Sequence, residues 1–395
     1  MRRLVIVADD LTGACDSAAL LHRRGRTSVV LDAAGEWPDD PVLAVDTDSR
    51  HRDAGLAAQR VAAVTERALG LDARLVKKID STLRGHVAVE LRAVAEATAR
   101  SGNRALLVVA PAFPGTGRTT RDGVVHVDGR RLSAHGSDGD VLRLLAAGGL
   151  RADRVGLDDL ESGRLPGALA QAYAGDLDAV VVDGETDAHL EAVVSASGQG
   201  DTPVVLAGSG GLTRPLAGSA VGVEPSPLRA GSTLVVVGSY SQASRDQRQR
   251  LVEHGVSAVV LADPAGTADR VRRALHDGPV VLSPDPAAPV VRAEAPAVAR
   301  ALAEATAGVL DKVGTLVVTG GETARAVLML AGVDHLRIAG EIEPGVVRGH
   351  VPRLHLDLVT KAGAFGDRDA LLRCLPEPSA ERAPEPVSTW RGTTP

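Results

Sequence analysis

Short aliphatic runs rich in Val, Ile and Leu alternate with amphipathic stretches of roughly ten to fifteen residues along most of this chain. Such an alternation is typical of βα units, in which a helix follows each strand and crosses back over the sheet. Connections of this kind place neighbouring strands parallel to one another. The sequence therefore predicts an α/β protein built on mainly parallel sheets that are flanked by helices.

The first series of alternating segments occupies the N-terminal half of the chain. Its expected strands are 4–8, 28–31, 42–45, 75–79, 105–110, 179–182 and 204–207. Its expected helices include 16–24, 54–69, 87–100 and 138–147. One hairpin interrupts this order, because residues 124–127 are followed by Asp128 and Gly129, a pair that readily adopts the positive φ of a tight turn.

A second series of alternating segments follows a break in the pattern at 222–231, where the sequence GVEPSPLRAG contains two prolines. Its expected strands are 233–237, 258–261, 279–282, 315–319 and 354–360. A length of 395 residues exceeds one ordinary domain, so we expect two domains, residues 1–225 and 226–375, each with its own sheet. The Pro-rich and charged segment 376–395 is expected to be disordered.

Composition disfavours several classes of partner. Aromatic residues make up 2% of the chain, and the formal net charge is −6. Nucleic-acid binding needs a basic face and aromatic rings on which bases can stack, so we expect no nucleic acid as a partner. The longest apolar runs are too short to span a membrane. Only Cys15 and Cys374 occur, far apart, which indicates neither a disulfide framework nor a thiolate metal site, and we expect a cytoplasmic location.

Charged and hydroxyl residues stand at the ends of three expected strands of the first half. They are Asp9 and Asp10 after the first strand, Asp48 and Arg50 after the third, and Asp80, Ser81 and Arg84 after the fourth. Ligands of open parallel sheets bind outside the carboxyl ends of the strands. Carboxylates accept hydrogen bonds from sugar hydroxyls, and Arg50, Arg84 or Lys78 can pair with an acid group. The mixture indicates a polyhydroxylated acid as ligand; the alternative is that these residues only cap the following helices.

The fifth strand runs into a long loop, residues 110–123, that contains Phe113 and Arg118 among several Gly and Pro residues. A polar loop at the carboxyl end of a strand is more often a binding loop than a spacer. This one lacks the residue spacing of a Walker-type phosphate loop. We therefore expect the loop to contact the acidic ligand rather than a phosphate chain.

Three glycine-rich segments stand at strand ends in the second half. They are 238–241 with Ser239 and Ser241, 320–323 with Gly320, Gly321, Glu322 and Thr323, and 361–367 with Lys361 and Gly363. Each precedes a helix-compatible stretch, so backbone N–H groups and helix N-termini would face one side and form an anion site, typically for phosphates. The alternative is that the glycines only form turns and helix caps. Lys361 is one of four lysines and a candidate for contacting a phosphate.

A turn is expected at 340–346, where Glu341 and Glu343 stand close together. Carboxylates beside a phosphate site usually bind Mg²⁺ or a ribose. A solvated turn without a ligand explains the same residues nearly as well.

Six segments of this chain together resemble the four-carbon acid sugar kinases. They are VADDLTGACDSA, KKIDSTLRGHVAVEL and APAFPGTGRTTRDGVVHVDG in the first half, and VVTGGETARAVL, GEIEPGVV and TKAGAFGD in the second. The resemblance extends from about residue 4 to 373. It implies an N-terminal domain that binds the acid sugar, a C-terminal domain that binds ATP, and transfer of the γ-phosphoryl group to the terminal hydroxyl of threonate, erythronate or a 3-oxo-tetronate.

Matching positions assign roles to individual residues. The acid-sugar motifs contain Asp9, Asp10, Asp80, Ser81, Arg84 and Arg118, and the nucleotide motifs contain Gly320, Gly321, Glu322, Thr323 and Gly363, together with Ser239 or Ser241. We expect Asp10 or Asp80 to deprotonate the sugar hydroxyl, with Mg²⁺ on the phosphates of ATP. Arg84 and Arg118 are expected to hold the sugar carboxylate once the two domains close on each other. The metal ligands stay unassigned.

Two other classes of function stay open. A dehydrogenase or isomerase of a related acid sugar would bind a dinucleotide in the second half, although the chain lacks the GxGxxG fingerprint and its downstream acid. A nucleotide-binding sensor without catalysis would need only the glycine-rich segments. Association into a homo-oligomer is left open as well.

Overall fold

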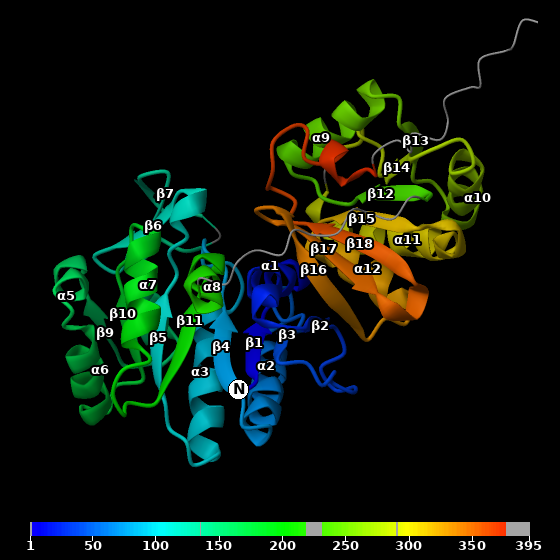
Figure 1. The fold of residues 1–395 in the computed structure, drawn as a ribbon. Coiled ribbons are helices and arrows are strands. Elements are labelled where there is room, and N and C mark those ends of the chain that lie inside the picture. The colour runs from blue at the N-terminus through cyan, green and yellow to red at the C-terminus, as the bar shows by residue number, and fades with distance from the viewer. Residues whose placement is uncertain (1, 135, 219–230, 290, 377–395) are drawn as a thin grey trace, which may run out of the picture.

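A computed structural model describes residues 2–134, 136–218, 231–289 and 291–376. Within them the chain has the expected α/β architecture, with mostly parallel strands and helices on both faces of the sheet (Figure 1). The predicted domain boundary at 222–231 and the predicted tail, 376–395, lie almost wholly outside the described residues. None of the described helices is both long and apolar enough to cross a membrane.

The N-terminal half contributes eight parallel strands in the order β2-β3-β1-β4-β11-β5-β10-β9. They are β1 (Leu4–Ala8), β2 (Thr27–Val30), β3 (Val42–Asp46), β4 (Arg74–Lys78), β5 (Leu106–Ala110), β9 (Ala152–Val155), β10 (Ala179–Val182) and β11 (Val204–Gly208). The helices are α1 (Leu11–Leu21), α2 (Ala54–Gly70), α3 (Val87–Arg100), α4 (Val141–Ala147), α5 (Leu157–Glu161), α6 (Leu165–Ala174), α7 (Asp187–Ala196) and α8 (Gly210–Ala217). Strands β1, β3 and β4 are neighbours, so the charged residues at their carboxyl ends meet at one edge of the sheet.

Strand β1 explains why these strands appear as continuous apolar runs. Leu4, Ile6 and Ala8 pack into a hydrophobic core on one face of the sheet, with α1 and α8. Val5 and Val7 pack into a second core on the other face, with α2 and α3. Since side chains alternate across a strand, a sheet that is covered by helices on both faces needs apolar residues at every position.

The C-terminal half contributes five parallel strands and two antiparallel ones in the order β13-β14-β12-β15-β18-β17-β16. They are β12 (Thr233–Val237), β13 (Ser257–Val260), β14 (Val280–Ser283), β15 (Thr315–Thr319), β16 (His335–Glu343), β17 (Val346–Val351) and β18 (Leu356–Lys361). The helices are α9 (Gln242–Glu253), α10 (Pro264–Ala274), α11 (Ala295–Ala307) and α12 (Gly321–Leu330). Strands β12, β15 and β18, which precede the three glycine-rich segments, are also neighbours.

The prediction of two separate sheets is wrong for the described residues. β16 and β17 form an antiparallel hairpin around Pro344 and Gly345, where the sequence predicts only a turn. β16 also pairs with β2, so fifteen described strands form one continuous sheet. The pairing of β16 with β2 escapes the sequence pattern because it joins a strand near the N-terminus to one some three hundred residues later, and local periodicity carries no signal for such a contact.

The expected hairpin at 124–127 is confirmed. β6 (Arg118–Arg121), β7 (Val124–Val127) and β8 (Arg130–Arg131) form a separate three-stranded antiparallel sheet. Asp128 and Gly129 connect β7 and β8 with φ angles of 50° and 76°. Two consecutive positive φ angles match the twist of a hairpin, so this dipeptide sets the turn.

Two helices begin at positions other than those expected. The side chain of Asp10 accepts a hydrogen bond from the Gly13 N–H, so α1 begins at Leu11 and not at residue 16. Asp140 caps α4 in the same way, and that helix begins at Val141 rather than at 138. The N-cap carboxylates shift both helix starts because they satisfy amide groups that the first turn leaves free.

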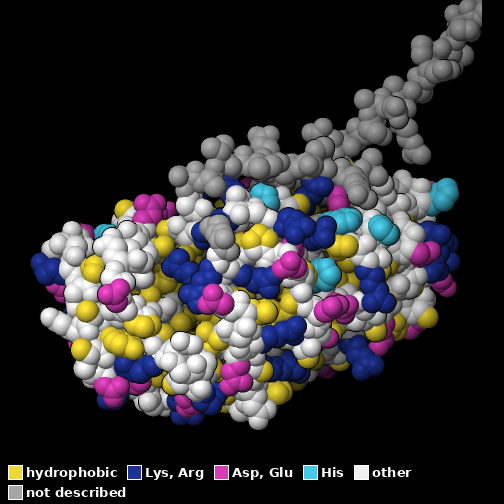
Figure 2. Space-filling view, turned by 60° about the horizontal axis from the view of Figure 1, so that its bottom comes forward, with side chains coloured by type: hydrophobic (Ala, Val, Ile, Leu, Met, Phe, Trp, Pro, Cys, Tyr) yellow, Lys and Arg dark blue, Asp and Glu magenta, His cyan; other side chains and the backbone are white. Residues whose placement is uncertain are grey.

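Basic and acidic side chains are interspersed on the face that Figure 2 shows. This agrees with a chain of 44 basic and 50 acidic residues. Many of these side chains form exposed ion pairs, such as Arg100 with Glu66 at 2.8 Å, which contribute little to stability individually.

Candidate functional site

Two adjoining cavities occupy the cleft between the carboxyl ends of the N-terminal strands and the glycine-rich segments of the C-terminal half. We call the first the glycine-lined cavity; its volume is about 320 Å³ and the three glycine-rich segments line it. The second, the mixed-charge cavity, has a volume of about 250 Å³. Both are lined by Asp10, Thr12, Arg50, Arg84, Ala362, Ala364 and Phe365.

A larger cavity of about 580 Å³ lies at the opposite, amino ends of the N-terminal strands, near Arg74 and Val204. None of the residues singled out from the sequence lines it. Ligands of parallel sheets bind at the carboxyl ends of the strands, where loops and helix N-termini converge. The two cavities of the cleft are therefore the better candidates for a functional site.

Asp9, Asp10 and Arg50 form a compact ionic network at the end of β1. The Arg50 guanidinium donates to both carboxylate oxygens of Asp9 at 2.7 and 2.8 Å, and to Oδ2 of Asp10 at 2.5 Å. Burial would raise the pKa of Asp9, but Arg50 and Lys77 outweigh burial and hold that pKa below its usual range. Arg50 therefore neutralises two carboxylates of the protein, and its N–H groups are committed to them.

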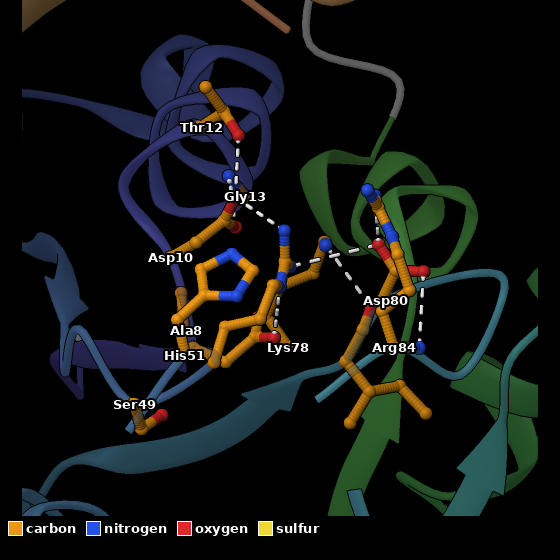
Figure 3. A network of polar contacts seen from close by, with 12 residues as sticks. Ala8, Asp10, Thr12, Gly13, Ser49, His51, Lys78, Asp80 and Arg84 are labelled. Carbon is orange, nitrogen blue, oxygen red and sulfur yellow. Dashed lines mark hydrogen bonds and ion pairs between the residues drawn. The ribbon is translucent and has the colours of Figure 1, made fainter. Parts of the chain in front are cut away.

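Asp10 lies at the junction of the two cavities, since it lines both. Its Oδ1 accepts from the Gly13 N–H at 2.9 Å, and its Oδ2 accepts from the Thr12 hydroxyl at 2.7 Å (Figure 3). The same Oδ2 also accepts from Arg50. These contacts hold the carboxylate in one orientation at the N-terminus of α1.

Asp80 lines only the mixed-charge cavity. Its carboxylate accepts from the Thr82 N–H at 2.9 Å, from the Thr82 hydroxyl at 2.6 Å and from Arg84 at 2.6 Å. Burial would raise the pKa of Asp80, but Arg84, Arg50 and Thr82 outweigh it and hold that pKa well below its usual range. A carboxylate of such low basicity organises its own loop and is a poor proton acceptor.

Cationic groups in the mixed-charge cavity differ in how far the protein already uses them. Arg84 is about half exposed and is paired with Asp80. Lys78 makes a hydrogen bond with the Ile79 carbonyl at 3.1 Å and is otherwise directed to the cavity. Arg118 donates from one terminal nitrogen to the Thr116 carbonyl, while its buried Nε has no partner among the described residues. Arg118 and Lys78 are thus better placed than Arg50 to meet a ligand carboxylate, and Ser81 lines the same cavity.

Asp48 lines the glycine-lined cavity, not the mixed-charge one. Burial would raise its pKa, but Arg52, Arg325 and Arg60 outweigh burial, and the pKa lies below its usual range. Arg325 of α12 also contacts Asp46 at 2.5 Å, so this arginine joins the C-terminal half to the end of β3. The ion pairs of Arg325 with Asp46 and Asp48 connect the two walls of the cleft.

The predicted residues of the glycine-rich segments come together as expected. Ser239, Ser241, Gly320, Gly321, Glu322, Thr323 and Gly363 all line the glycine-lined cavity. The Ser241 hydroxyl is engaged, because it donates to the Gly363 carbonyl at 2.5 Å and accepts from the Ser244 N–H at 3.1 Å as the cap of α9. Ser239 makes only longer contacts of 3.3 Å, so it is the serine more available to a ligand.

Lys361 is fully buried and does not line either cavity of the cleft. Its ammonium donates to the carbonyls of Ala362 at 3.0 Å, Gly363 at 3.2 Å and Phe365 at 2.8 Å. Burial lowers the pKa of this ammonium to about 8. The lysine that the sequence suggests as a phosphate contact instead holds the loop that borders both cavities.

Several lining residues were not singled out from the sequence as site residues. His51 and Arg325 line the glycine-lined cavity, and Asp16 and Ser209 line the mixed-charge cavity. Asp16 stands within the segment VADDLTGACDSA but was expected only to begin a helix. No group of three or more His, Cys, Asp or Glu residues suited to a metal ion occurs in the described part of the chain.

Two family models match this chain. A sugar-binding N-terminal domain matches residues 4–216, and a nucleotide-binding C-terminal domain matches residues 234–371. The first contains most residues of the mixed-charge cavity, and the second contains the glycine-rich segments.

Known proteins are similar over nearly the whole chain. A D-threonate kinase of Cupriavidus necator is 38% identical, covering 96% of this chain and 99% of its own length. A 3-oxo-tetronate kinase of Methylobacterium radiotolerans is 30% identical, covering 93% of this chain and 97% of its own length. A crystal structure of a Salmonella typhimurium LT2 protein superposes with a TM-score of 0.80 at 23% identity, covering 94% of this chain and 98% of the other, which supports the fold.

Proposed function

This chain belongs to the four-carbon acid sugar kinase family, and we propose that it transfers the γ-phosphoryl group of ATP to the terminal hydroxyl of a four-carbon acid sugar, with D-threonate as the first candidate. Erythronate and a 3-oxo-tetronate are the alternatives within the family. The observation that carries the proposal is the position of Asp10, which borders two cavities of different chemistry.

The glycine-lined cavity is proposed to hold the phosphates of ATP. Helices α9 and α12 begin at this cavity, and their N-terminal N–H groups favour anionic ligands. The glycines let the segments that line this cavity pack closely against one another: a Cβ on Gly238 would lie 2.0 Å from the Thr323 hydroxyl, and one on Gly363 would lie 2.1 Å from that of Ser239. We accordingly assign ATP binding to residues 226–375 and acid-sugar binding to residues 1–225.

Asp10 is proposed as the group that takes the proton of the sugar hydroxyl. In the transfer, the hydroxyl oxygen forms a bond to the γ-phosphorus, the bond from that phosphorus to the β–γ bridging oxygen breaks, and ADP leaves. Asp10 can reach both reactants because it lines both cavities, whereas Asp80 lines one cavity and has a strongly lowered pKa. Phosphoryl transfer needs positioning above all, and three hydrogen-bond donors hold the Asp10 carboxylate in place.

Mg²⁺ is proposed to enter with ATP and to neutralise its phosphates. The described residues offer no cluster of three or more ligands, which fits an ion that is held largely by phosphates and water. We assign no protein ligand to it.

Arg118 is proposed to bind the carboxylate of the sugar, together with Lys78. Replacing Arg118 with Gln should raise the KM for the acid sugar about 10- to 100-fold, because a hydrogen bond to a charged group contributes about 1.5–3 kcal/mol. The KM for ATP should stay near the wild-type value. Arg130→Gln, an exposed position of the same small sheet, is the matched control. Equal increases of both KM values would contradict the assignment.

Lys361 is proposed as a positioning residue for the loop 362–365. Lys361→Met leaves three carbonyls without their shared donor, so KM values for both ATP and the acid sugar should rise about 5-fold or more. Steady-state kinetics with each substrate varied measures the effect. Lys312→Met, at an exposed lysine, should change neither KM. A rise confined to the KM for ATP would point instead to a direct phosphate contact.

A substrate panel tests the proposed function. ADP release is measured with D-threonate, D-erythronate and 3-oxo-tetronate, and NMR locates the phosphate in the product. We expect ADP formation that depends on the acid and a phosphate at the terminal oxygen. A dehydrogenase, an isomerase or a sensor would release no ADP, and that result with all three acids would overturn the proposal.

Two expectations about the surroundings of the protein rest on the sequence alone. The first is the expectation of a cytoplasmic location, and the second is the oligomeric state, for which a homo-oligomer stays open. Light scattering of the purified protein measures the second.

A further inference from the structure

Asp16 lies in the second turn of α1 and lines the mixed-charge cavity. The helix begins at Leu11, so Asp16 is a half-buried side chain in the wall of the cavity and not a helix cap. Among the described residues it forms no hydrogen bond and no ion pair. It differs in this from Asp10 and Asp80, the two other carboxylates of the cavity, which each accept at least three hydrogen bonds.

The surroundings of Asp16 act on the pKa of its carboxyl in both directions. Burial raises the pKa of its carboxyl to about 7; the Lys78 ammonium of β4 and Arg50, which follows β3, act in the opposite direction, while Asp10 and Glu341 of β16 raise it further. The carboxyl is half-buried and has no hydrogen bond to the protein, so a ligand in the mixed-charge cavity can donate to it. Such a group in a cleft is a candidate for contacting a ligand.

We propose that Asp16 determines substrate specificity by accepting a hydrogen bond from a secondary hydroxyl of the acid sugar, and so favours a 3-hydroxy acid over a 3-oxo acid. The inference rests on the proposed function. An ionised carboxylate only accepts hydrogen bonds, and so does the oxygen of a ketone. With a 3-oxo acid, neither the ketone oxygen nor the ionised Asp16 carboxylate can donate to the other. A hydroxyl at the same carbon donates a hydrogen bond to the carboxylate. Sites that are built to bind a hydroxyl reject analogues without it strongly.

The test compares D-threonate with 3-oxo-tetronate in the wild-type enzyme and in Asp16→Asn. The wild type should have the higher kcat/KM for D-threonate. The asparagine amide can donate to a ketone, so the ratio of the two kcat/KM values should fall about 10-fold or more, with the KM for ATP unchanged. Asp16→Ser, which can also donate, gives the same readout if the first variant does not fold. Asp187→Asn, an exposed aspartate of α7, should keep the wild-type ratio.

The pH dependence provides a second readout that a purely structural role would not change. The neutral carboxyl of Asp16 can donate a hydrogen bond to a ketone, whereas the ionised carboxylate only accepts. The wild-type ratio of kcat/KM for D-threonate to kcat/KM for 3-oxo-tetronate should therefore rise as the pH rises through about 7. This step should be absent in Asp16→Asn. Asp46 of β3, whose pKa burial raises to about 6, and ATP titrate in both proteins, so the difference between the two profiles isolates Asp16.

The outcomes separate this inference from the proposed function. If the wild type phosphorylates neither acid, the proposed function fails. If it phosphorylates D-threonate and Asp16→Asn keeps both the ratio and the pH step, only the assignment of Asp16 fails. A wild-type preference for the 3-oxo acid would overturn that assignment as well.

Discussion

Asp10→Asn is expected to lower kcat about 10²- to 10⁴-fold, the usual contribution of a general base, while the KM for ATP changes little. The amide cannot take the proton of the sugar hydroxyl. It keeps the size of the side chain and an Oδ1 that can accept from the Gly13 N–H. The NH2 group that replaces Oδ2 no longer accepts from the Thr12 hydroxyl and Arg50. Kinetics at saturating concentrations of both substrates, together with ATP binding measured by calorimetry, separate loss of chemistry from loss of binding.

Helix capping has to be excluded as the cause of that loss. Asparagine caps helices about as well as aspartate, so α1 should keep its start in Asp10→Asn. Asp53→Asn is the matched control, because Asp53 caps α2 through the Leu56 N–H at 2.9 Å and lines neither cavity of the cleft. The control should retain wild-type kcat. An unchanged kcat in Asp10→Asn would remove Asp10 from the role of the base.

Gly363→Ala should raise the KM for ATP about 10-fold or more. A Cβ at this position would lie 2.1 Å from the Ser239 hydroxyl oxygen and 2.8 Å from the Ser239 Cβ. Overpacking of this kind typically costs about 1–3 kcal/mol, and here the loop or Ser239 has to move at the edge of the glycine-lined cavity. ATP titrations by calorimetry and by initial rates measure the effect.

Gly167→Ala is the control for the general effect of an added methyl group. Gly167 lies in α6, and a Cβ there meets nothing within 4 Å, so both KM values should be unchanged. The outcome that contradicts the assignment is a Gly363→Ala enzyme with a normal KM for ATP and a raised KM for the acid sugar. It would place the nucleotide elsewhere in the cleft.

Local sequence patterns determined much of the fold. Helix α3 spans Val87–Arg100, as its periodicity predicts, and β1 spans Leu4–Ala8. The turn at Asp128 and Gly129 follows from the few residue types that tolerate positive φ. The charged ends of β1, β3 and β4 were also visible, because residues at the carboxyl end of a strand stand directly after an apolar run.

The functional meaning of individual site residues was less accessible from the sequence. Arg50 appears there as a free cation, yet Asp9 and Asp10 occupy its guanidinium. Lys361 appears as a phosphate ligand, yet it binds three carbonyls of its own loop. Asp16 appears as the start of a helix, yet it lies in the wall of a cavity.

The sequence by itself determined which segments become strands and helices, and which polar residues follow the strands, since both depend on neighbours along the chain. Only the tertiary structure decided which charges neutralise one another and how the pairing of β16 with β2 joins the two halves into one sheet. The physical reason is that an ion pair or a strand pairing depends on distances in space between segments that are remote in sequence. A charge that is left without a partner, such as that of Asp16, can be recognised only after all those contacts are known.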